Sequence, residues 1–468
     1  MDFPNHDDLE SLTIHNTEIM KKIYFKIHSG LAGLAVILIF LPGISKAQNQ
    51  SLSLQKAIEQ AKTNNRDLRI DSLNISKSRQ QTEITKGFLL PNISLTGQFQ
   101  RYFQRPVFFG LNSAPSSEGI AYSRFGGQEI TGAQITLAQP LYNSGAKYEI
   151  QRRKLLEKQS RLSYQEREVN VVAQVKQNYV QLLVLRERLR LQNESILRNK
   201  KALADSRSLL AQGRALRVDT LRAYTSVKNL EPDVLRLTYA LQISQQQLSI
   251  LIGNDAETEY VLSDSLQFNP SDSIPTENGT FRASILHRPD FQILNLNKEI
   301  NDKQIDLYKS ARLPVVSFVS QYQLVTQTNN FRFDRAGWPP VFYAGIQVAV
   351  PIFSGMQNVN KIALGKIDRQ QSDMIYQNAQ EQLKTEVKQV VAGLYEASQR
   401  IRTQQNVSET AEISYSITKY RYEKGVASRL ELMDAEFALT TAKSNYLEAV
   451  FDYLSAKIEL DRTTGRVD

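Results

Sequence analysis

The feature that most restricts the fold is the length of two stretches with an uninterrupted helical pattern. Residues 146–211 contain neither proline nor glycine, and residues 356–424 contain glycine only at Gly365 and Gly393. At about 1.5 Å of rise per residue, each stretch predicts a helix roughly 100 Å long. The chain is therefore expected to be built mainly from very long helices.

Apolar residues recur every seven positions along these stretches and along the segments that follow them. The series are Val175, Leu182, Leu189, Ile196, Leu203 and Leu210; Val387, Leu394, Ile401, Tyr415 and Tyr422, interrupted at Ser408; Val227, Val234, Leu241 and Leu248; and Leu432, Leu439, Tyr446, Tyr453 and Leu460. A seven-residue repeat underwinds helices into coiled-coil pairs. Pro232 falls within the third series and is expected to kink or restart its helix.

The same order of motifs occurs twice, which indicates a tandem duplication. The matching motifs are Asn65-Arg66-Asp67 with Arg288-Pro289-Asp290, Leu90-Pro91 with Leu313-Pro314, Pro140 to Gly145 with Pro351 to Gly355, Gly213 with Gly425, and Gly253 with Gly465. Each copy is far too long for a solenoid repeat, so it is interpreted as a duplicated half of one domain.

Two short segments in each copy alternate between apolar and polar residues, as half-buried strands do. Ile93, Leu95, Phe99 and Phe103 alternate with Ser94, Thr96, Gln98 and Gln100; Ala133, Ile135 and Leu137 alternate with Gln134 and Thr136. The second copy repeats the pattern with Val316, Phe318, Tyr322 and Leu324, and then with Phe342, Ala344, Ile346, Val348 and Val350. Polar loops are expected between the paired strands, at 106–127 and 328–340.

Each copy thus reads as helix, strand, loop, strand, very long helix, turn and helix. The first repeat is placed at 48–280, with a helix at 52–89 that breaks near Asn64-Asn65, strands at about 92–104 and 130–139, helices at 146–211 and 216–252, and a linker at 253–280. The second is placed at 281–468, with a first helix, strands at about 315–326 and 341–350, and helices at 356–424 and 428–464.

The N-terminal region reads as a secretory signal peptide at 1–47. Met20-Lys21-Lys22 opens a basic segment, residues 30–41 are apolar, and Ser45-Lys46-Ala47 is a small-x-small cleavage motif. Residues 1–19 are acidic and fit a signal badly, so translation is expected to start at Met20 and the mature chain at Gln48.

The sequence has no run of about 18 apolar residues that would form a transmembrane helix, so any membrane role is expected to run through strands. The strands have about the length that a tilted strand needs to cross a bilayer, and aromatic residues lie near their ends. Four strands cannot close on themselves, and unpaired edges are not tolerated in lipid. Several chains would therefore have to associate. The alternative is a small soluble sheet at one end of a coiled coil.

Composition argues against catalysis. The chain has no cysteine, and His287 is the only histidine beyond the signal segment, where it reads as a structural residue at a helix start. No catalytic residues, cofactor or metal site are therefore predicted. The formal net charge is +9, but it is dispersed along helices among acidic residues, which is typical of a solvated surface and not of a nucleic-acid partner.

Together these motifs resemble the TolC-type outer-membrane efflux proteins, over nearly all of residues 51–466. The resemblance rests on Leu52-Ser53-Leu54-Gln55-Lys56-Ala57-Ile58, on the Leu-Pro and Pro-Leu/Ile-aromatic-Ser-Gly motifs around each strand pair, and on Tyr422-Glu423-Lys424-Gly425 before Leu430-Glu431-Leu432-Met433-Asp434-Ala435. Singly these motifs are weak, but their order and duplication are specific.

The resemblance implies a mainly α protein with a small β part. Long antiparallel coiled-coil helices would form an α-barrel, and four strands per protomer would contribute to a trimeric transmembrane β-barrel. It also implies a homotrimer in outer-membrane lipid that extends into the periplasm. Its partners would be a periplasmic adaptor (membrane fusion) protein and an inner-membrane RND, ABC or MFS transporter.

The resemblance further places a periplasmic gate and an adaptor-docking tip near the helical turns. The gate residues would be Tyr422, Glu431 and Asp434, and the tip residues Gly213, Ala215, Leu216, Gly425, Ala427 and Ser428. The turn glycines suit helix C-caps, whichever role the turns play. Ala427 stands where related channels have an arginine of the closing network, with Arg429 out of register. Glu431 and Asp434 could equally be ordinary acidic residues in a first helical turn.

The predicted function is a passive exit duct of a tripartite efflux or type I secretion system. The alternative is a soluble periplasmic coiled-coil scaffold or adaptor. As cargo, small amphiphiles are favoured over secreted proteins. Metal ions are the least favoured, given five methionines in the chain.

Overall fold

The structure is a computed structural model that describes residues 50–109, 122–258, 260–266 and 274–466. The first copy contains β1 (Gln50–Leu52), α2 (Leu54–Asn64), α3 (Arg66–Gly87), β2 (Asn92–Arg101), β3 (Val107–Phe109), β4 (Tyr122–Arg124), β5 (Glu129–Tyr142), α4 (Ser144–Ala211), α5 (Arg217–Leu251) and β6 (Tyr260–Leu262). The second contains α6 (Glu277–His287), α7 (Pro289–Ser310), β7 (Val315–Thr328), β8 (Pro340–Ala349), α8 (Gln357–Glu423) and α9 (Arg429–Thr463). The predicted signal peptide at 1–47 lies outside the described residues.

The helices of the two copies have nearly equal lengths. Helices α2 and α6 both have 11 residues, α3 and α7 both have 22, and α5 and α9 both have 35. The long helices α4 and α8 have 68 and 67 residues. This agreement supports the interpretation of the sequence as a duplicated half.

Corresponding contacts close each copy. Asn65 interrupts the first helical segment because its side-chain oxygen accepts hydrogen bonds from the N–H groups of Asp67 and Leu68, and so caps α3. Gly253, at the end of α5, packs so tightly there that a Cβ would come within 2.3 Å of the Asn64 carbonyl oxygen. Gly465, at the end of α9, packs in the same way on the His287 carbonyl. In each copy, the end of the long helical hairpin (α4–α5 or α8–α9) therefore packs on the break between the two short helices of the same copy.

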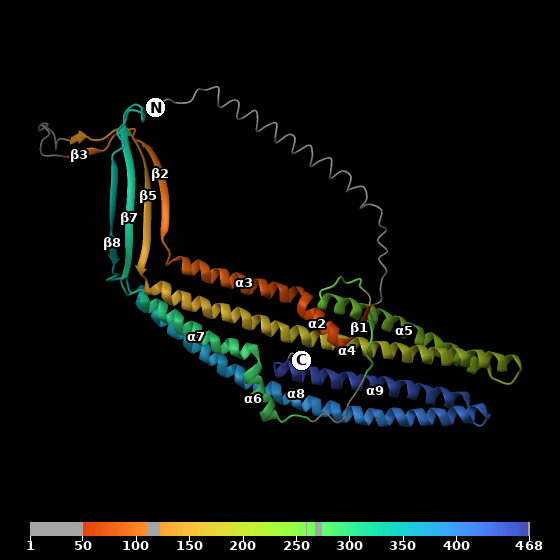
Figure 1. The fold of residues 1–468 in the computed structure, drawn as a ribbon. Helices are drawn as coiled ribbons and strands as arrows, with labels where there is room; N and C mark the ends of the chain where they lie inside the picture. The colour runs from red at the N-terminus through yellow and green to blue at the C-terminus, as the bar shows by residue number, and fades with distance from the viewer. Residues whose placement is uncertain (1–49, 110–121, 259, 267–273, 467–468) are drawn as a thin grey trace, which may run out of the picture. The chain divides into compact units, whose positions relative to one another are not determined.

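Four strands form one antiparallel sheet in the order β2-β5-β7-β8. The helices pack in a matching order, with α3 and α7 on either side of α4 and α8 beyond α7. Farther along, α5 packs on α4, α4 on α9, and α9 on α8. Every junction between a long strand and a helix lies at the same end of the sheet (Figure 1).

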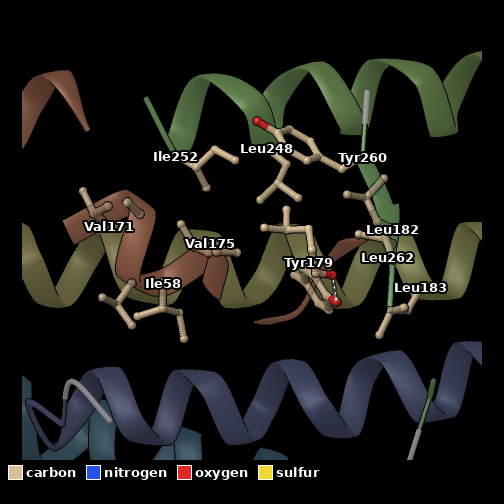
Figure 2. Close-up of a cluster of buried hydrophobic side chains, with 14 of the residues drawn as sticks. Ile58, Val171, Val175, Tyr179, Leu182, Leu183, Leu248, Ile252, Tyr260 and Leu262 are labelled. Atoms are coloured by element: carbon tan, nitrogen blue, oxygen red, sulfur yellow. Dashed lines mark hydrogen bonds between the residues drawn. The ribbon is translucent and has the colours of Figure 1, made fainter. Parts of the chain in front are cut away.

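The largest apolar cluster surrounds the middle of α4. Val175, Tyr179 and Leu182 of α4 are at most 1% exposed and pack with Leu248 of α5 and Leu262 of β6 (Figure 2). Val175 and Leu182 belong to the predicted seven-residue series, which therefore faces a core as coiled-coil positions do. This cluster joins α2, α4, α5, β1 and β6 into one packed region.

A buried tyrosine fixes the β1–β6 strand pair against α4. The Tyr179 hydroxyl donates to the Leu52 carbonyl at 2.9 Å and lies 3.0 Å from the Asp264 carboxylate, which also accepts from the Leu54 N–H. The hydrogen bond from the Leu54 N–H lowers the pKa of Asp264, whereas burial raises the pKa of Tyr179. Arg186 donates to the carbonyls of Leu262 and Asp264. These bonds explain why Leu52 and Leu54 lie on the middle of α4.

The structure corrects two expectations and part of a third. Helix α5 continues through Pro232, so the expected restart is wrong, whereas the expected kink stays a prediction. The carbonyl of Lys228, which proline leaves without its usual helical partner, belongs to an exposed residue and can be hydrated. The segment expected to be a polar loop at 106–127 contains the β3–β4 hairpin, and the linker at 253–280 contains β6 and the start of α6. Strands of three residues are too short to show an alternation in sequence.

Candidate functional site

The four-stranded sheet has one apolar and one polar face, as its register shows. Leu95 lies opposite Ile135, Ile135 opposite Tyr322, and Tyr322 opposite Phe342. The neighbouring row on the other face consists of Thr96, Gln134, Gln323 and Val341. The predicted assignment of side chains to two faces is therefore confirmed.

The apolar face is exposed within the chain. Leu95, Phe342 and Ile346 are 72%, 67% and 68% exposed, and among the described elements no helix packs broadly on the sheet. On the polar face, Gln321 donates to Gln134 and Gln323 and accepts from the Tyr343 hydroxyl at 3.0 Å. A soluble chain would rarely leave so continuous an apolar surface uncovered.

Charged residues are absent from the long strands except at one end. Within β2, β5, β7 and β8, only Arg101 and Glu129 are charged, and they lie opposite each other in the last register pair. On the helical side the first charged residues are Lys86, Lys147, Arg312 and Lys361, beyond the strand ends. The sheet is thus a charge-free slab between two charged borders, which suits a bilayer interior.

The two helical turns are built alike. Gly213 has φ +69° and Gly425 has φ +76°, values that favour glycine. At the first turn the Gly213 N–H donates to Leu210 O and the Arg214 N–H to Leu209 O. Corresponding bonds run from Gly425 to Tyr422 and from Val426 to Arg421. Both turns are Schellman motifs, so the predicted C-caps are confirmed.

The residues after the two glycines differ in exposure and capping. Leu216 is 69% exposed and precedes α5 without a side-chain cap, whereas Ala427 is only 8% exposed. Ser428 begins α9 with a capping box, in which its hydroxyl accepts from the Glu431 N–H. Ala215 is half-buried. The six predicted tip residues therefore lie in two similar turns, of which the α8–α9 turn is the better capped.

Glu431 takes part in this capping box and in an ion pair. Its carboxylate accepts from the Ser428 N–H at 3.1 Å, and Arg421 lies 3.7 Å away. The hydrogen bond from the Ser428 N–H is the main reason why the pKa of Glu431 is lowered. Glu431 therefore has a structural role at the helix start, in addition to any role in a pore.

Tyr422 and Asp434 lie apart from that capping box. The Tyr422 ring is half-buried and stands 5.8 Å from the Arg429 guanidinium carbon. Asp434 is exposed and lines a groove of about 560 Å³ between α4, α5 and α9, together with Asp233 and Glu436. Arg429 has buried Nε and Nη2 atoms with no hydrogen-bond partner among the described residues.

A buried polar link joins α4 and α9 and was not predicted from the sequence. Glu436 is 5% exposed and accepts from Arg198 Nε at 3.0 Å and from Asn199 Nδ2 at 3.1 Å. The Arg198 guanidinium also faces the Tyr415 ring of α8 at 6.0 Å. Burial, followed by the charge of Glu436, raises the pKa of Tyr415. The signal was present, because Asn199 and Glu436 occupy core positions of their heptads.

No site for a metal ion was found in the described part of the chain, where no three His, Cys, Asp or Glu side chains come close enough together. Within the same residues, no helix is both long and apolar enough to pass through a bilayer.

Comparison with known families decides the identity. Residues 57–254 and 282–466 match the family model of the outer membrane efflux proteins. The chain belongs to this family. Members of the outer membrane efflux family are passive transport channels that reside in the outer membrane and extend into the periplasm, and this chain is such an export channel. The resemblance inferred from the sequence is confirmed.

Relatives within the efflux family serve different export systems. The chain is 21% identical to the cation efflux system protein CusC of Escherichia coli, covering 84% of this chain and 81% of that protein. It is also 21% identical to the proteases secretion protein PrtF of Dickeya chrysanthemi, covering 93% and 92%. The structure superposes on the CmeC outer membrane channel of Campylobacter jejuni with a TM-score of 0.73, at 17% identity, covering 88% and 85%. This similarity to outer membrane channels of known structure confirms the predicted fold class. The predicted association of three chains stays a prediction.

Proposed function

We propose that this efflux-family chain works as a homotrimeric exit duct. Cargo would pass through it from a periplasmic adaptor and an inner-membrane transporter, without chemical change. The observation that carries the proposal is the matching order of strands and helices across the chain. In this order, the first and the last strand and helix each have a neighbour on one side only, so the chain has two open edges.

Each open edge consists of an unpaired strand and unpartnered helices, so one edge can join the other. One edge is formed by β2, α3 and α5 of the first copy, and the other by β8 and α8 of the second. Exposed apolar side chains occur on both helical edges, for example Leu235 and Tyr239 on α5 and Ile413 and Ile417 on α8. Because unpaired strand edges are not tolerated in lipid, each β2 edge would pair with the β8 edge of a sister chain.

Such a head-to-tail joint forms a ring if the rotation closes. A closed barrel of about eight strands is filled by its own side chains, so a barrel with an open passage requires more strands. Three chains would supply twelve strands, with the polar glutamine face toward the water-filled interior. The apolar face would then lie against the lipid.

Cysteine cross-linking tests this arrangement directly, because the natural chain has no cysteine. Single cysteines along β2 should give no disulfide-linked product, and neither should single cysteines along β8. Chains with one cysteine on each strand should give a ladder that ends at three chains. A ladder of another length would refute the trimer, and a mature protein that stays monomeric in water without detergent would refute the duct.

We propose that the gate lies at the α8–α9 turn and its contacts with α4. Tyr422, Glu431 and Asp434 keep the gate role assigned by resemblance. The buried bonds of Glu436 with Arg198 and Asn199 support a closed state, because they join the two helical hairpins. Arg429, directed toward Tyr422, would replace the arginine that is missing at Ala427.

The gate is tested by the conductance of the channel in planar bilayers. Replacing Glu431 and Asp434 together by Gln and Asn should raise the conductance of the resting channel. The matched control changes Glu381 to Gln and Asp255 to Asn, two exposed acids away from the turn and from the α4–α9 link. If the conductance stays at the wild-type level, both residues are ordinary helix-start acids.

We propose that both turns dock onto the adaptor, through Gly213, Ala215 and Leu216 and through Gly425, Ala427 and Ser428. The exposed side chains of Leu216 and Val426 offer apolar contact at the two tips. Leu216→Asp should abolish co-purification with the adaptor while the trimer persists. Leu197→Asp, at a similarly exposed position on α4 and away from both open edges, is the control. Loss of the trimer in Leu216→Asp would show a different role for the tip.

Small amphiphiles remain the proposed cargo. The polar face of the sheet carries glutamine and hydroxyl side chains and no charge, so it would offer little selection by charge. Expression in a strain that lacks its own export channels, with the cognate transporter, should restore dye efflux. Restored protein secretion without dye efflux would favour the second cargo class.

A further inference from the structure

Arginines gather at the end of the sheet that lies away from the helices. The described parts of the turns there contain Arg101, Arg105, Arg124, Arg332 and Arg335, against the carboxylates Glu129 and Asp334 and no lysine. The export function does not require this excess of five arginines over two carboxylates. We call the exposed members on and next to the sheet, Arg101, Arg332 and Arg335, the arginine rim.

Arg101 lies on the apolar face of the sheet. It pairs in register with Glu129, and Glu129 with Thr328. Because side chains alternate between faces, Arg101 shares a face with Phe99 and Leu95. It is therefore the first charged residue that a lipid molecule along this face would meet beyond the apolar surface.

Aromatic rings hold the Arg101 guanidinium in place. It stacks 4.7 Å above the Phe331 ring, which in turn stacks on Phe99 at 6.1 Å. Phe333 packs edge-on against both rings. The loop that carries these rings is thus folded back onto the apolar face.

Glu129 holds this loop in place through hydrogen bonds. Its side chain is buried and accepts from the Thr328 hydroxyl at 3.0 Å and from the Phe331 N–H at 3.4 Å. This second bond helps to hold Phe331 at a positive φ of 57°. Arg101 approaches Glu129 only to 4.0 Å and keeps a side chain that is 45% exposed. Its donor fork therefore remains open to an external anion.

We propose that the arginine rim binds the phosphate groups of phosphorylated lipid in the outer leaflet. The inference rests on the proposed function, in which the apolar face contacts acyl chains. Guanidinium groups bind phosphate through paired, charge-assisted hydrogen bonds. The exposed rings of Phe103 and Trp338 suit the headgroup level, where aromatic residues accumulate.

A lipid fits this surface better than a soluble anion does. Arg101 continues the same face as the apolar rows, so one molecule can place its chains on Leu95 and Phe99 and its phosphate at Arg101. A free phosphate would gain only the electrostatic part of the interaction, which salt weakens.

The probe is lipid A with two phosphates, compared with its dephosphorylated form. Native mass spectrometry of the whole oligomer in mixed micelles measures how much of each lipid is retained. Wild type should retain the bisphosphorylated form preferentially, and equimolar inorganic phosphate should not displace it. The triple variant Arg101→Gln, Arg332→Gln, Arg335→Gln should lose roughly fivefold in affinity for each arginine.

The control variant removes three exposed helical arginines, Arg79→Gln, Arg207→Gln and Arg222→Gln, and should bind like wild type. Equal retention of both lipids by wild type would overturn the proposal without any variant, and so would an unchanged triple variant. Conductance of the same wild-type preparation separates the two proposals: a conducting channel without phosphate preference refutes only the lipid site. The duct is refuted if neither wild type nor the Glu431→Gln, Asp434→Asn variant conducts.

Discussion

A buried carboxylate at a coiled-coil core position must find partners on another helix. Glu436 finds them in Arg198 and Asn199, so the pair of helices that meets there is defined by polar contacts as well as by apolar packing. An isolated buried charge is strongly unfavourable, whereas a fully bonded one can be close to neutral. The link therefore determines which helices pair with each other and adds little to the overall stability.

Removing one partner of this link should be more harmful than removing both. Arg198→Met leaves Glu436 buried without its charge partner and should destabilise the α4–α9 contact by about 3 kcal/mol. The double variant Arg198→Met, Glu436→Leu should restore most of that loss, as measured by local hydrogen–deuterium exchange. The exposed pair Lys384 and Glu381 on α8 serves as the control, where both kinds of variant should change exchange little. A double variant as damaged as the single one would contradict the coupling.

The cap at Ser428 should depend on pH. The pKa of Glu431 is lowered in the folded protein from an ordinary value of 4.5. Its contribution is therefore fully present above that value and is lost as the pH falls through the lowered folded pKa. Protection factors in the first turn of α9, which correct for the intrinsic pH dependence of amide exchange, should fall at acidic pH in wild type. Glu431→Gln keeps the capping pattern and should remove this dependence; an identical pH profile in both proteins would show another cause.

At the scale of elements, local patterns predicted most of the fold. The absence of proline and glycine marked α4, and alternation assigned the faces of β2, β5, β7 and β8, because both features depend only on neighbouring residues. The link between Glu436 and Arg198 was not predicted, since it depends on how two coiled coils are rotated against each other. The expected restart at Pro232 was wrong because an exposed helix can hydrate a freed carbonyl, which a local rule does not consider.

Two glycines of the second copy should respond oppositely to alanine. Gly425 has φ +76°, so Gly425→Ala should destabilise the turn by about 1 kcal/mol and speed local hydrogen exchange roughly fivefold. Gly393 lies within α8, where an added Cβ would have nothing within 4 Å. Gly393→Ala should therefore slow exchange in the middle of α8 by a few-fold. Slower exchange at the turn in Gly425→Ala would show that its left-handed conformation is not required.

At the scale of the whole molecule, membrane insertion depends on the two faces of the sheet. Leu95→Arg places a charge in the middle of the apolar face and should cost about 2–4 kcal/mol of insertion energy. Thr96→Arg places the same charge on the polar face and should be tolerated. The measure is the amount of heat-modifiable oligomer in outer-membrane fractions. Equal losses in both variants would mean that the apolar face does not meet lipid.

The matching open edges have a genetic consequence. If the ring forms as proposed, every joint brings together two different surfaces encoded by one gene. A harmful change on the β2 side could then be repaired by a change on the β8 side of the same sequence, although the two residues meet only between molecules. In a cell that makes equal amounts of intact and edge-damaged chains, one damaged member would spoil its ring, so well under half of the channels should remain sound.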